Sequence, residues 1–258
     1  MWPAMIEKAW AKAKGTYGQA DGGFVVSGLR AITGAPVFQY VLSSSAYTLS
    51  ETEAFDLLST ADTSGYPMGA STSAGSNQTP NDCGISYGHA FSILTTFTMS
   101  GNKMIMLRDP FGSTGYSGPW HKDDTAWTDA LVALVPFGVD PRTSDTDGIF
   151  VMPIATFVDT SQNCIYSYQI AHVRESEGFS STTYDKEGDD GTMKDYYVTV
   201  PAADGGIYFM AETYYQDMVP EECTTGTYLG NTVTAPVLDI TIYQDGATVS
   251  TVYKVYSD

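Results

Sequence analysis

Two short apolar runs, each with one polar side chain at its edge, place the strongest constraint on what this chain can fold into. The first run follows Gly88 and His89 and extends to Leu94, and the second ends at Arg108 and Asp109. Such runs predict two paired strands that hold the His89 imidazole beside the Asp109 carboxylate. Nucleophilic hydrolases hold a general base and its orienting group in this way. Taken singly, each residue has an ordinary structural explanation, because Asp-Pro before glycine is common turn chemistry.

Helical and strand patterns around these runs predict an α+β fold. Apolar residues at helical spacing follow Pro3 and stop at Gly15, and Ser50 with Glu53 forms a capping box before a later helix. Further helical patterns cover 24–32, 125–134 and 153–157, and strand patterns cover 68–73, 95–101, 103–108, 149–152 and 164–170. Together they predict an antiparallel sheet with flanking helices over residues 1–170.

The last third of the chain has a different composition. From residue 171 onward there are 15 Asp and Glu against 4 Lys and Arg, so −11 of the total charge of −18 lies there. Alternating patterns at 196–200, 206–212, 237–243 and 248–256 predict strands. We therefore expect residues 171–258 to form an acidic, all-β, sandwich-like module.

The charge balance and the apolar runs of the chain argue against nucleic-acid binding and against a membrane-spanning helix. Lys and Arg number 12 against 30 Asp and Glu, and no basic stripe is present to neutralise phosphates. Nucleic-acid binding is therefore not expected. No apolar run approaches the roughly 18–20 residues of a membrane-spanning helix, so no membrane span is expected.

The cysteines Cys83, Cys164 and Cys223 are odd in number and far apart in sequence. This spacing argues against a disulfide framework or a zinc site and predicts three packing or surface thiols. It also favours a reducing compartment, and we expect a cytoplasmic location.

Several segments, in order, resemble the calpain family of papain-like cysteine proteases. They are the tryptophan-containing start at 2–17, the histidine segment at 88–92, the segment at 107–112, the tryptophan loop around 118–127 and the aspartate-glycine segment from 147 to 157. The resemblance runs from residue 2 to about residue 165 and covers the histidine-bearing half of the catalytic domain. The acidic module fits the β-sandwich that follows this domain in calpains only loosely.

The resemblance implies a mechanism and assigns residues to it. A cysteine thiolate attacks a peptide carbonyl, a histidine transfers the proton, and an asparagine orients the histidine. His89 matches the histidine, Asp109 stands in the asparagine position, and Phe111 stands where the family has a shielding tryptophan. A carboxylate can also orient an imidazole, so Asp109 alone does not disable the site.

The nucleophile and the calcium ligands of the family are where this sequence departs from it. Nothing here resembles the family's glycine-aspartate-cysteine-tryptophan segment. At the calcium positions, Gly115, Lys122 and Ile149 replace acidic residues, and Asp147 is retained. One carboxylate beside a lysine predicts poor Ca²⁺ binding, because hard cations need about 6–8 oxygen ligands. A one-residue shift of the loop would bring Asp123 and Asp124 to these positions instead.

Three functions follow as hypotheses. The first is a catalytically inactive calpain-like domain that acts as a binding or structural module, with no cofactor and with the former substrate cleft as a peptide groove. The alternative is a piece of an active calpain-like cysteine endopeptidase whose cysteine half lies upstream, as the abrupt start near Trp2 suggests. The third is a component of a larger assembly that docks a protein partner through the acidic module.

Overall fold

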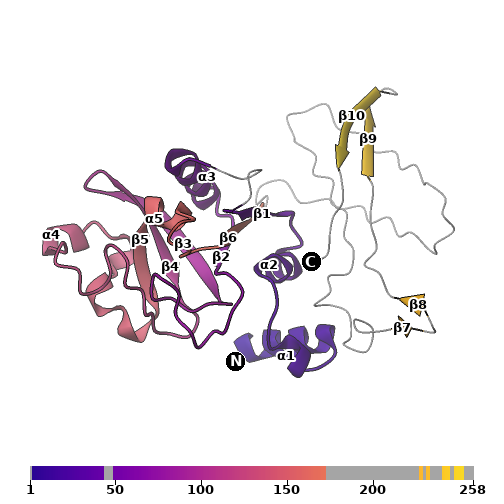
Figure 1. Ribbon diagram of the computed structural model, residues 1–258, viewed down its shortest axis with the longest axis horizontal. Helices are drawn as coiled ribbons and strands as arrows, with labels where there is room; N and C mark the ends of the chain where they lie inside the picture. The colour runs from indigo at the N-terminus through magenta and orange to yellow at the C-terminus, as the bar shows by residue number, and fades with distance from the viewer. Residues whose placement is uncertain are drawn as a thin grey trace. The chain divides into compact units, whose positions relative to one another are not determined.

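The computed structural model describes residues 2–43 and 49–172, together with four short strands in the last third of the chain (Figure 1). The chain divides into two units, residues 23–173 and residues 1–22 with 174–258. Helices and antiparallel strands together confirm the α+β class. Among the described residues, none of the helices is long and apolar enough to cross a membrane. The predicted domain boundary near residue 171 stays a prediction.

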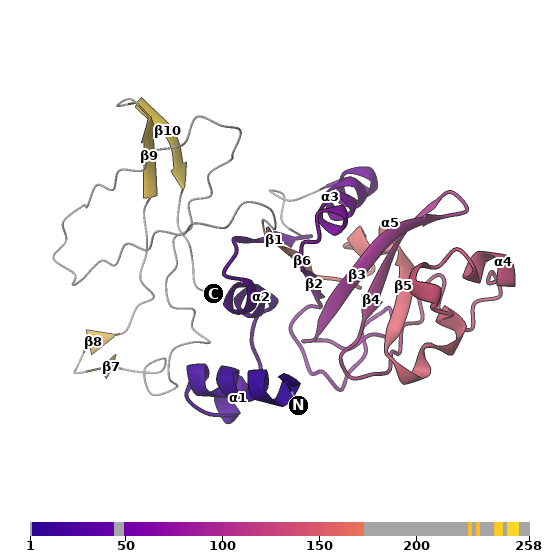
Figure 2. The same ribbon diagram turned by 180° about the vertical axis from the view of Figure 1, so that it is seen from behind.

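A six-stranded antiparallel sheet forms the centre of the unit 23–173 (Figures 1 and 2). Its spatial order is β1-β6-β2-β3-β4-β5. The strands are β1 Val37–Val41, β2 Met68–Ser71, β3 Ala90–Met99, β4 Asn102–Arg108, β5 Ile149–Pro153 and β6 Ser167–Ala171. Since β2 pairs with both β3 and β6, Ser71 at its end lies opposite Ala90 and Ser167 at their starts. The loops that lead into β3 and β6 therefore meet at one end of the sheet, beside the end of β2.

Two helices of this unit, α3 and α4, begin at side-chain caps that the sequence supplies. Its α-helices are α2 Val25–Thr33, α3 Glu51–Thr63, α4 Asp129–Val132 and α5 Ile154–Val158, and 3₁₀ turns cover Pro136–Gly138 and Pro141–Thr146. The predicted capping box is present, because Ser50 Oγ accepts a hydrogen bond from Glu53 N while Glu53 Oε2 accepts one from Ser50 N. The Thr128 side chain caps α4 in the same way by accepting from Leu131 N.

Two apolar cores lie on opposite faces of the sheet. Leu58 of α3, Phe157 of α5 and Leu107 of β4 belong to one core. Met104 and Met106 alternate with the residues of that core along β4, and they pack with Trp127 in the second. The long β3 contributes Phe91 and Ile93 to the first core and Met99 to the second. Its register against β4 shifts between Ile93 and Thr95.

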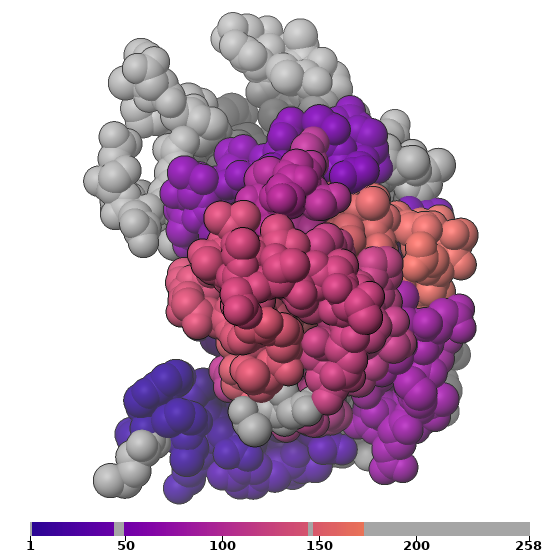
Figure 3. Space-filling view, turned by 90° about the vertical axis from the view of Figure 1, so that its left-hand side faces the viewer, coloured from indigo at the N-terminus to yellow at the C-terminus, as the bar shows by residue number. Residues whose placement is uncertain are grey.

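The segment between β4 and β5 covers the second core and forms a large part of one outer face of the unit, drawn in rose in Figure 3. It contains α4 and both 3₁₀ turns. Trp120 and Trp127 meet edge to face inside it, with ring centroids 5.0 Å apart. The tryptophans are thus part of the packing that holds this long connection on the sheet.

The second unit contributes α1 Trp2–Lys14, a 3₁₀ turn at Gly18–Ala20 and two short hairpins. The hairpins pair β7 Thr227–Tyr228 with β8 Asn231–Thr232, and β9 Ile240–Gln244 with β10 Ala247–Val252. The last hairpin overlaps the strands predicted at 237–243 and 248–256. The strands predicted at 196–200 and 206–212 lie outside the described residues.

Candidate active site

His89 and Asp109 meet at one end of the sheet, as their spacing predicts. His89 immediately precedes β3 and Asp109 immediately follows β4. These strands are neighbours, with Ser92 opposite Arg108, so the two flanking residues come together. His89 Nε2 lies 2.8 Å from Asp109 Oδ1. This contact joins the base candidate directly to its predicted orienting group.

The hydrogen bond fixes which imidazole nitrogen is available for chemistry. An ionised carboxylate only accepts hydrogen bonds, so Nε2 of a neutral His89 must carry the proton. Nδ1 then holds the lone pair, and no described residue forms a hydrogen bond with it. The side chains of His89 and Asp109 are 9% and 6% exposed. The arrangement is that of an oriented base with one accepting nitrogen.

Two phenylalanines enclose the imidazole. Phe91 meets it edge to face, with ring centroids 4.9 Å apart, and Phe111 lies over it at 4.3 Å with an interplanar angle of 33°. Phe111 is itself 62% exposed, so it stands between His89 and solvent. The position predicted for a shielding side chain therefore lies over the ring. A phenyl ring covers less surface than an indole and has no N–H donor.

Asp109 is held by hydrogen bonds to both its backbone and its side chain. Asp109 N donates to Gly148 O at 2.9 Å, and Asp109 Oδ1 accepts a second hydrogen bond from Phe111 N at 2.9 Å. Gly148 has a φ of 72°, and a Cβ there would overlap the Asp109 carbonyl oxygen. The glycine of the aspartate-glycine segment thus lets β5 begin directly against the site.

Thr72, which the sequence did not single out, holds the backbone of His89. Thr72 N donates to His89 O at 3.0 Å, and Thr72 Oγ1 accepts from His89 N at 3.0 Å. On the other side, Gly88 has a φ of 55° and donates its N–H to Ser73 O at 2.7 Å. A Cβ on Gly88 would overlap the backbone of Gly75. These contacts are between segments distant in sequence, and no local signal marks them.

The cysteines correct one prediction. Cys83 and Cys164 are joined in a disulfide across 81 positions of sequence, with Cα atoms 5.3 Å apart. They were expected to be separate thiols, but the loops that lead into β3 and β6 meet beside the end of β2. Both residues are buried, so neither presents a thiol to His89. Cys223 lies outside the described residues.

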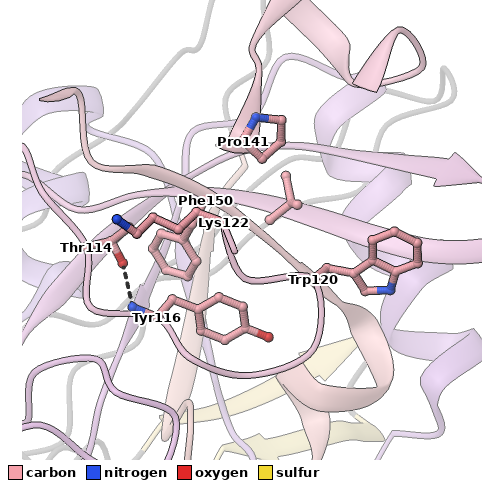
Figure 4. Close-up of a pocket in the computed structure, with 7 residues that line it drawn as sticks. Thr114, Tyr116, Trp120, Lys122, Pro141 and Phe150 are labelled. Atoms are coloured by element: carbon pink, nitrogen blue, oxygen red, sulfur yellow. Dashed lines mark hydrogen bonds between the residues drawn. The ribbon is translucent and has the colours of Figure 1, made fainter. Parts of the chain in front are cut away.

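Residues of the tryptophan loop and of β5 line one pocket together with Thr114, Tyr116 and Pro141 (Figure 4). Its lining consists of Thr114, Tyr116, Trp120, Lys122, Pro141, Phe150 and Val151. The Tyr116 hydroxyl donates to Pro119 O at 2.8 Å, and burial raises the pKa of this phenol. Hydrogen bonds from the backbone N–H groups of Ala126 and Trp120 lower the pKa of Asp124. The carboxylate of Asp124 therefore serves the loop's own turns.

The predicted calcium positions do not form a matching set of ligands. Asp147 Oδ1 accepts from Ile149 N at 3.0 Å, and the Asp147 carbonyl accepts from Arg108 Nε at 3.1 Å. Lys122 projects its chain into the neighbouring pocket. Within the described ranges, no group of three or more His, Cys, Asp or Glu side chains is arranged to hold a metal ion. The side chains at the aligned positions therefore do not supply the set of carboxylates that a Ca²⁺ ion would need, and weak Ca²⁺ binding stays a prediction.

Comparison with known proteins places these features in a family. Residues 1–165 match the model of the calpain family cysteine proteases. The chain is 30% identical to the calpain-type cysteine protease DEK1 of Arabidopsis thaliana over 134 residues, which are 51% of this chain and 6% of that protein. It is 29% identical to calpain-5 of Caenorhabditis elegans over 185 residues, or 61% of this chain and 28% of that protein. It is 28% identical to the calpain-2 catalytic subunit of Gallus gallus over 170 residues, or 61% of this chain and 22% of that protein.

The chain thus spans less than a third of the length of these relatives. With the family model matching well over half of its residues, the chain belongs to the calpain family of cysteine proteases.

Proposed function

We propose that this chain provides the general base and its orienting carboxylate for a calpain-type cysteine endopeptidase site, and that it does not cleave peptides by itself. The observation that carries the proposal is the 2.8 Å contact between His89 Nε2 and Asp109 Oδ1, which leaves Nδ1 as an acceptor. The antiparallel sheet with flanking helices is compatible with the histidine-bearing half of a papain-like fold.

The proposed chemistry assigns one task to each residue. His89 Nδ1 accepts the proton of a cysteine thiol, and the resulting thiolate attacks the peptide carbonyl carbon. The histidinium then returns this proton to the leaving amine nitrogen as the C–N bond breaks. Asp109 holds the ring orientation and stabilises its positive charge, and Phe111 limits access of water to the pair.

The missing component is the nucleophile. Cys83 and Cys164 are bound to each other, and no segment of the chain resembles the family's cysteine motif. A thiol from a cysteine-bearing half-domain, in the same polypeptide or on a partner, would have to face Nδ1. We therefore expect the isolated chain to leave peptide substrates intact.

A chimera tests the proposal. The segment of the Gallus gallus calpain-2 catalytic subunit that matches this chain is replaced by residues 1–165, and its own cysteine half is retained. We expect thiol-dependent peptidase activity that His89→Ala lowers by about a thousandfold or more. Asp109→Asn should keep most of this activity, because the amide oxygen accepts the same hydrogen bond. A folded chimera with no activity above its His89→Ala control would contradict the proposal.

A second candidate is a calpain-like binding or structural module without catalysis. It is supported by the replacements Asp109 and Phe111 at two site positions and by Gly115, Lys122 and Ile149 at the calcium positions. Its partner would be a protein or an extended peptide, docked in the former substrate cleft or on the acidic, sandwich-like module proposed for residues 171–258.

An inactive chimera with native circular dichroism would favour this second candidate. The supporting measurement is a pull-down with the full chain and a matched chain that carries Phe111→Ala, since Phe111 is exposed beside His89. A partner retained by the first and lost by the second would identify the cleft as the binding surface.

The cytoplasmic location remains a proposal, and the redox state of Cys83 and Cys164 in cell extracts tests it.

A further inference from the structure

The loop that leads into His89 is held by a buried asparagine. Asn81 Oδ1 accepts hydrogen bonds from Cys83 N at 3.0 Å and Ile85 N at 3.3 Å, so it closes the loop on itself. Its Nδ2 donates to Asn163 O at 3.2 Å and Cys164 O at 3.0 Å. One side chain therefore ties this loop, residues 81–88, to the segment that precedes β6.

The disulfide makes the same connection covalently. Cys83 and Cys164 are both buried and lie directly beside the contacts of Asn81. The Cys83 carbonyl also accepts a hydrogen bond from Ser117 N at 2.8 Å, which brings in the segment after β4. The loop is thus attached on both sides, toward β6 and toward the residues that follow Asp109.

Further hydrogen bonds connect the rest of the loop to His89. Asn81 N donates to Ile85 O at 2.7 Å, and Thr72 Oγ1 donates to Ser86 O at 2.8 Å. Thr72 also bonds the backbone of His89 itself. Six positions separate Cys83 from His89 in the sequence. A displacement at Cys83 would therefore reach the imidazole through a short, hydrogen-bonded path.

We infer that Asn81 and the Cys83–Cys164 disulfide together position His89, so that the His89–Asp109 pair responds to the thiol redox state of the chain. Reduction by a dithiol adds two electrons and two protons, breaks the S–S bond and leaves two cysteine thiols, while the dithiol becomes a disulfide. The direct connection of the loop to the segment that precedes β6 then depends on Asn81. The catalytic meaning of this device rests on the proposed function, but the positioning itself does not.

The first measurement is disulfide mapping of the full chain, purified without reductant and alkylated before digestion. We expect a linked pair of peptides containing Cys83 and Cys164, with Cys223 alkylated. Recovery of Cys83 and Cys164 as alkylated thiols would overturn the inference.

The second measurement reads His89 directly, by ¹⁵N–¹H correlation of the imidazole nitrogens in the full chain. The oxidised protein should show one tautomer with the proton on Nε2. Reduction, the double substitution C83S/C164S, or Asn81→Ala should give a mixture of tautomers and amide exchange about tenfold faster across residues 81–88. Asn81→Asp, which keeps both acceptor contacts and loses both donated ones, should fall between Asn81→Ala and the unchanged chain.

Cys223→Ser is the matched control, because it removes a cysteine that is not part of the Cys83–Cys164 disulfide. It should leave the imidazole spectrum unchanged. A purely structural role for the disulfide would lower stability without changing the tautomer. An unchanged His89 spectrum in reduced, still folded wild-type chain would overturn the inference, even if the substituted variants fail to fold. Disulfide mapping and the imidazole spectrum do not depend on peptidase activity. Their results are therefore independent of the result for the chimera.

Discussion

At the scale of single residues, the site depends on one carboxylate that performs two tasks. Asp109 Oδ1 accepts from both His89 Nε2 and Phe111 N, and it is almost fully buried. An amide oxygen could accept both hydrogen bonds equally well, which explains how an asparagine position can tolerate aspartate. The carboxylate differs in carrying a charge that pairs with a protonated imidazole.

Replacing Asp109 should separate these effects. Asp109→Ala leaves a buried imidazole N–H and the Phe111 N–H without their acceptor, so we expect a loss of about 1–3 kcal/mol in the free energy of unfolding. Asp109→Asn should cost less than about 1 kcal/mol, since it retains an acceptor oxygen. Urea denaturation at neutral pH measures both values. Equal losses for the two variants would mean that the hydrogen bonds contribute nothing beyond the charge.

Asp147 gives a second prediction at this scale, which concerns calcium. Its Oδ1 already bonds Ile149 N, and Lys122 lies in the nearby pocket that Val151 also lines. Millimolar CaCl₂ or excess EDTA should therefore leave the thermal unfolding midpoint unchanged, because too few oxygen ligands are present. Differential scanning calorimetry checks this. A Ca²⁺-dependent rise in the midpoint that Asp147→Ala abolishes would show that the loop rearranges to bind the ion.

At the scale of elements, α3 is defined by chemistry at its first turn. The hydrogen bonds from the Ser50 hydroxyl and the Ser50 backbone N–H lower the pKa of Glu53 from its ordinary value of 4.5. A group whose pKa is lower in the folded state stabilises the fold above its unfolded pKa, and that contribution is lost as the pH falls through the folded pKa. The capping box should thus strengthen α3 at neutral pH more than at pH 3.

The corresponding test compares Glu53→Gln with Glu51→Gln, its exposed neighbour in the same turn. Glu53→Gln should destabilise the chain at pH 7 and have a much smaller effect at pH 3. Ser50→Ala should cost about 1 kcal/mol at pH 7, because it removes the N-cap acceptor. Urea denaturation at both pH values measures these differences. Identical pH profiles for the two glutamate variants would argue against the box.

The irregularity in β3 is a feature of tertiary contact between elements. Asp62 near the end of α3 accepts from Thr95 Oγ1 at 2.6 Å and from Thr96 N at 2.9 Å. Thr95 is the first paired residue after the register shift of β3 against β4, and Thr96 follows it. The carboxylate of Asp62 thus satisfies a backbone N–H of β3 close to the irregularity.

Asp62→Ala should therefore cost about 1–3 kcal/mol in unfolding free energy, since it leaves the Thr96 N–H and the buried Thr95 hydroxyl without their acceptor. Asp56→Ala, on the exposed side of the same helix, is the control and should change stability by less than about 0.5 kcal/mol. Amide exchange at Thr96 should become faster in the first variant only. Unchanged exchange there would mean that the strand irregularity does not depend on α3.

The same elements show how far local patterns predict this fold. The α3 capping box and the hairpin of β3 and β4 follow from signals within a few residues, and the structure confirms them. β1 was not predicted, because its short sequence contains Gln39 between apolar residues and gains its order by pairing with β6. β2 was predicted, but its two partners are 20 and about 100 residues away and follow from topology alone.

The candidate site divides in the same manner. The pairing of His89 with Asp109 was predicted because both residues flank strands joined by one hairpin. The contacts of Thr72 and Asn81 and the Cys83–Cys164 bond were not, since each joins loops that meet only when β2 lies between β3 and β6. Spacing along the chain carries no information about such meetings.

At the scale of the whole molecule, the disulfide connects two segments 81 positions apart and encloses β3, β4, β5 and α5 within one covalent loop. Closing a loop of this length reduces the conformational entropy of the unfolded chain, and the chain-entropy model assigns it on the order of 4 kcal/mol of stabilisation. Measured values are commonly nearer 2–4 kcal/mol, because strain and residual structure reduce the gain. The bond should therefore stabilise the unit 23–173 as a whole, beyond its local effect on His89.

Reduced wild-type chain and C83S/C164S should both unfold at lower urea concentration than the oxidised chain, with a loss of about 2–4 kcal/mol. Since an unfolded chain without the cross-link exposes more surface, the dependence of the unfolding free energy on urea should also become steeper. Cys223→Ser should change neither quantity. In chains that also carry Trp2→Phe and Trp10→Phe, fluorescence of Trp120 and Trp127 reports unfolding of the second core, at a distance from the bond. If the tryptophan signal of the second core is lost at the same urea concentration with and without the cross-link, the disulfide acts only on the loop at His89. That outcome would contradict a role of the disulfide in global stability.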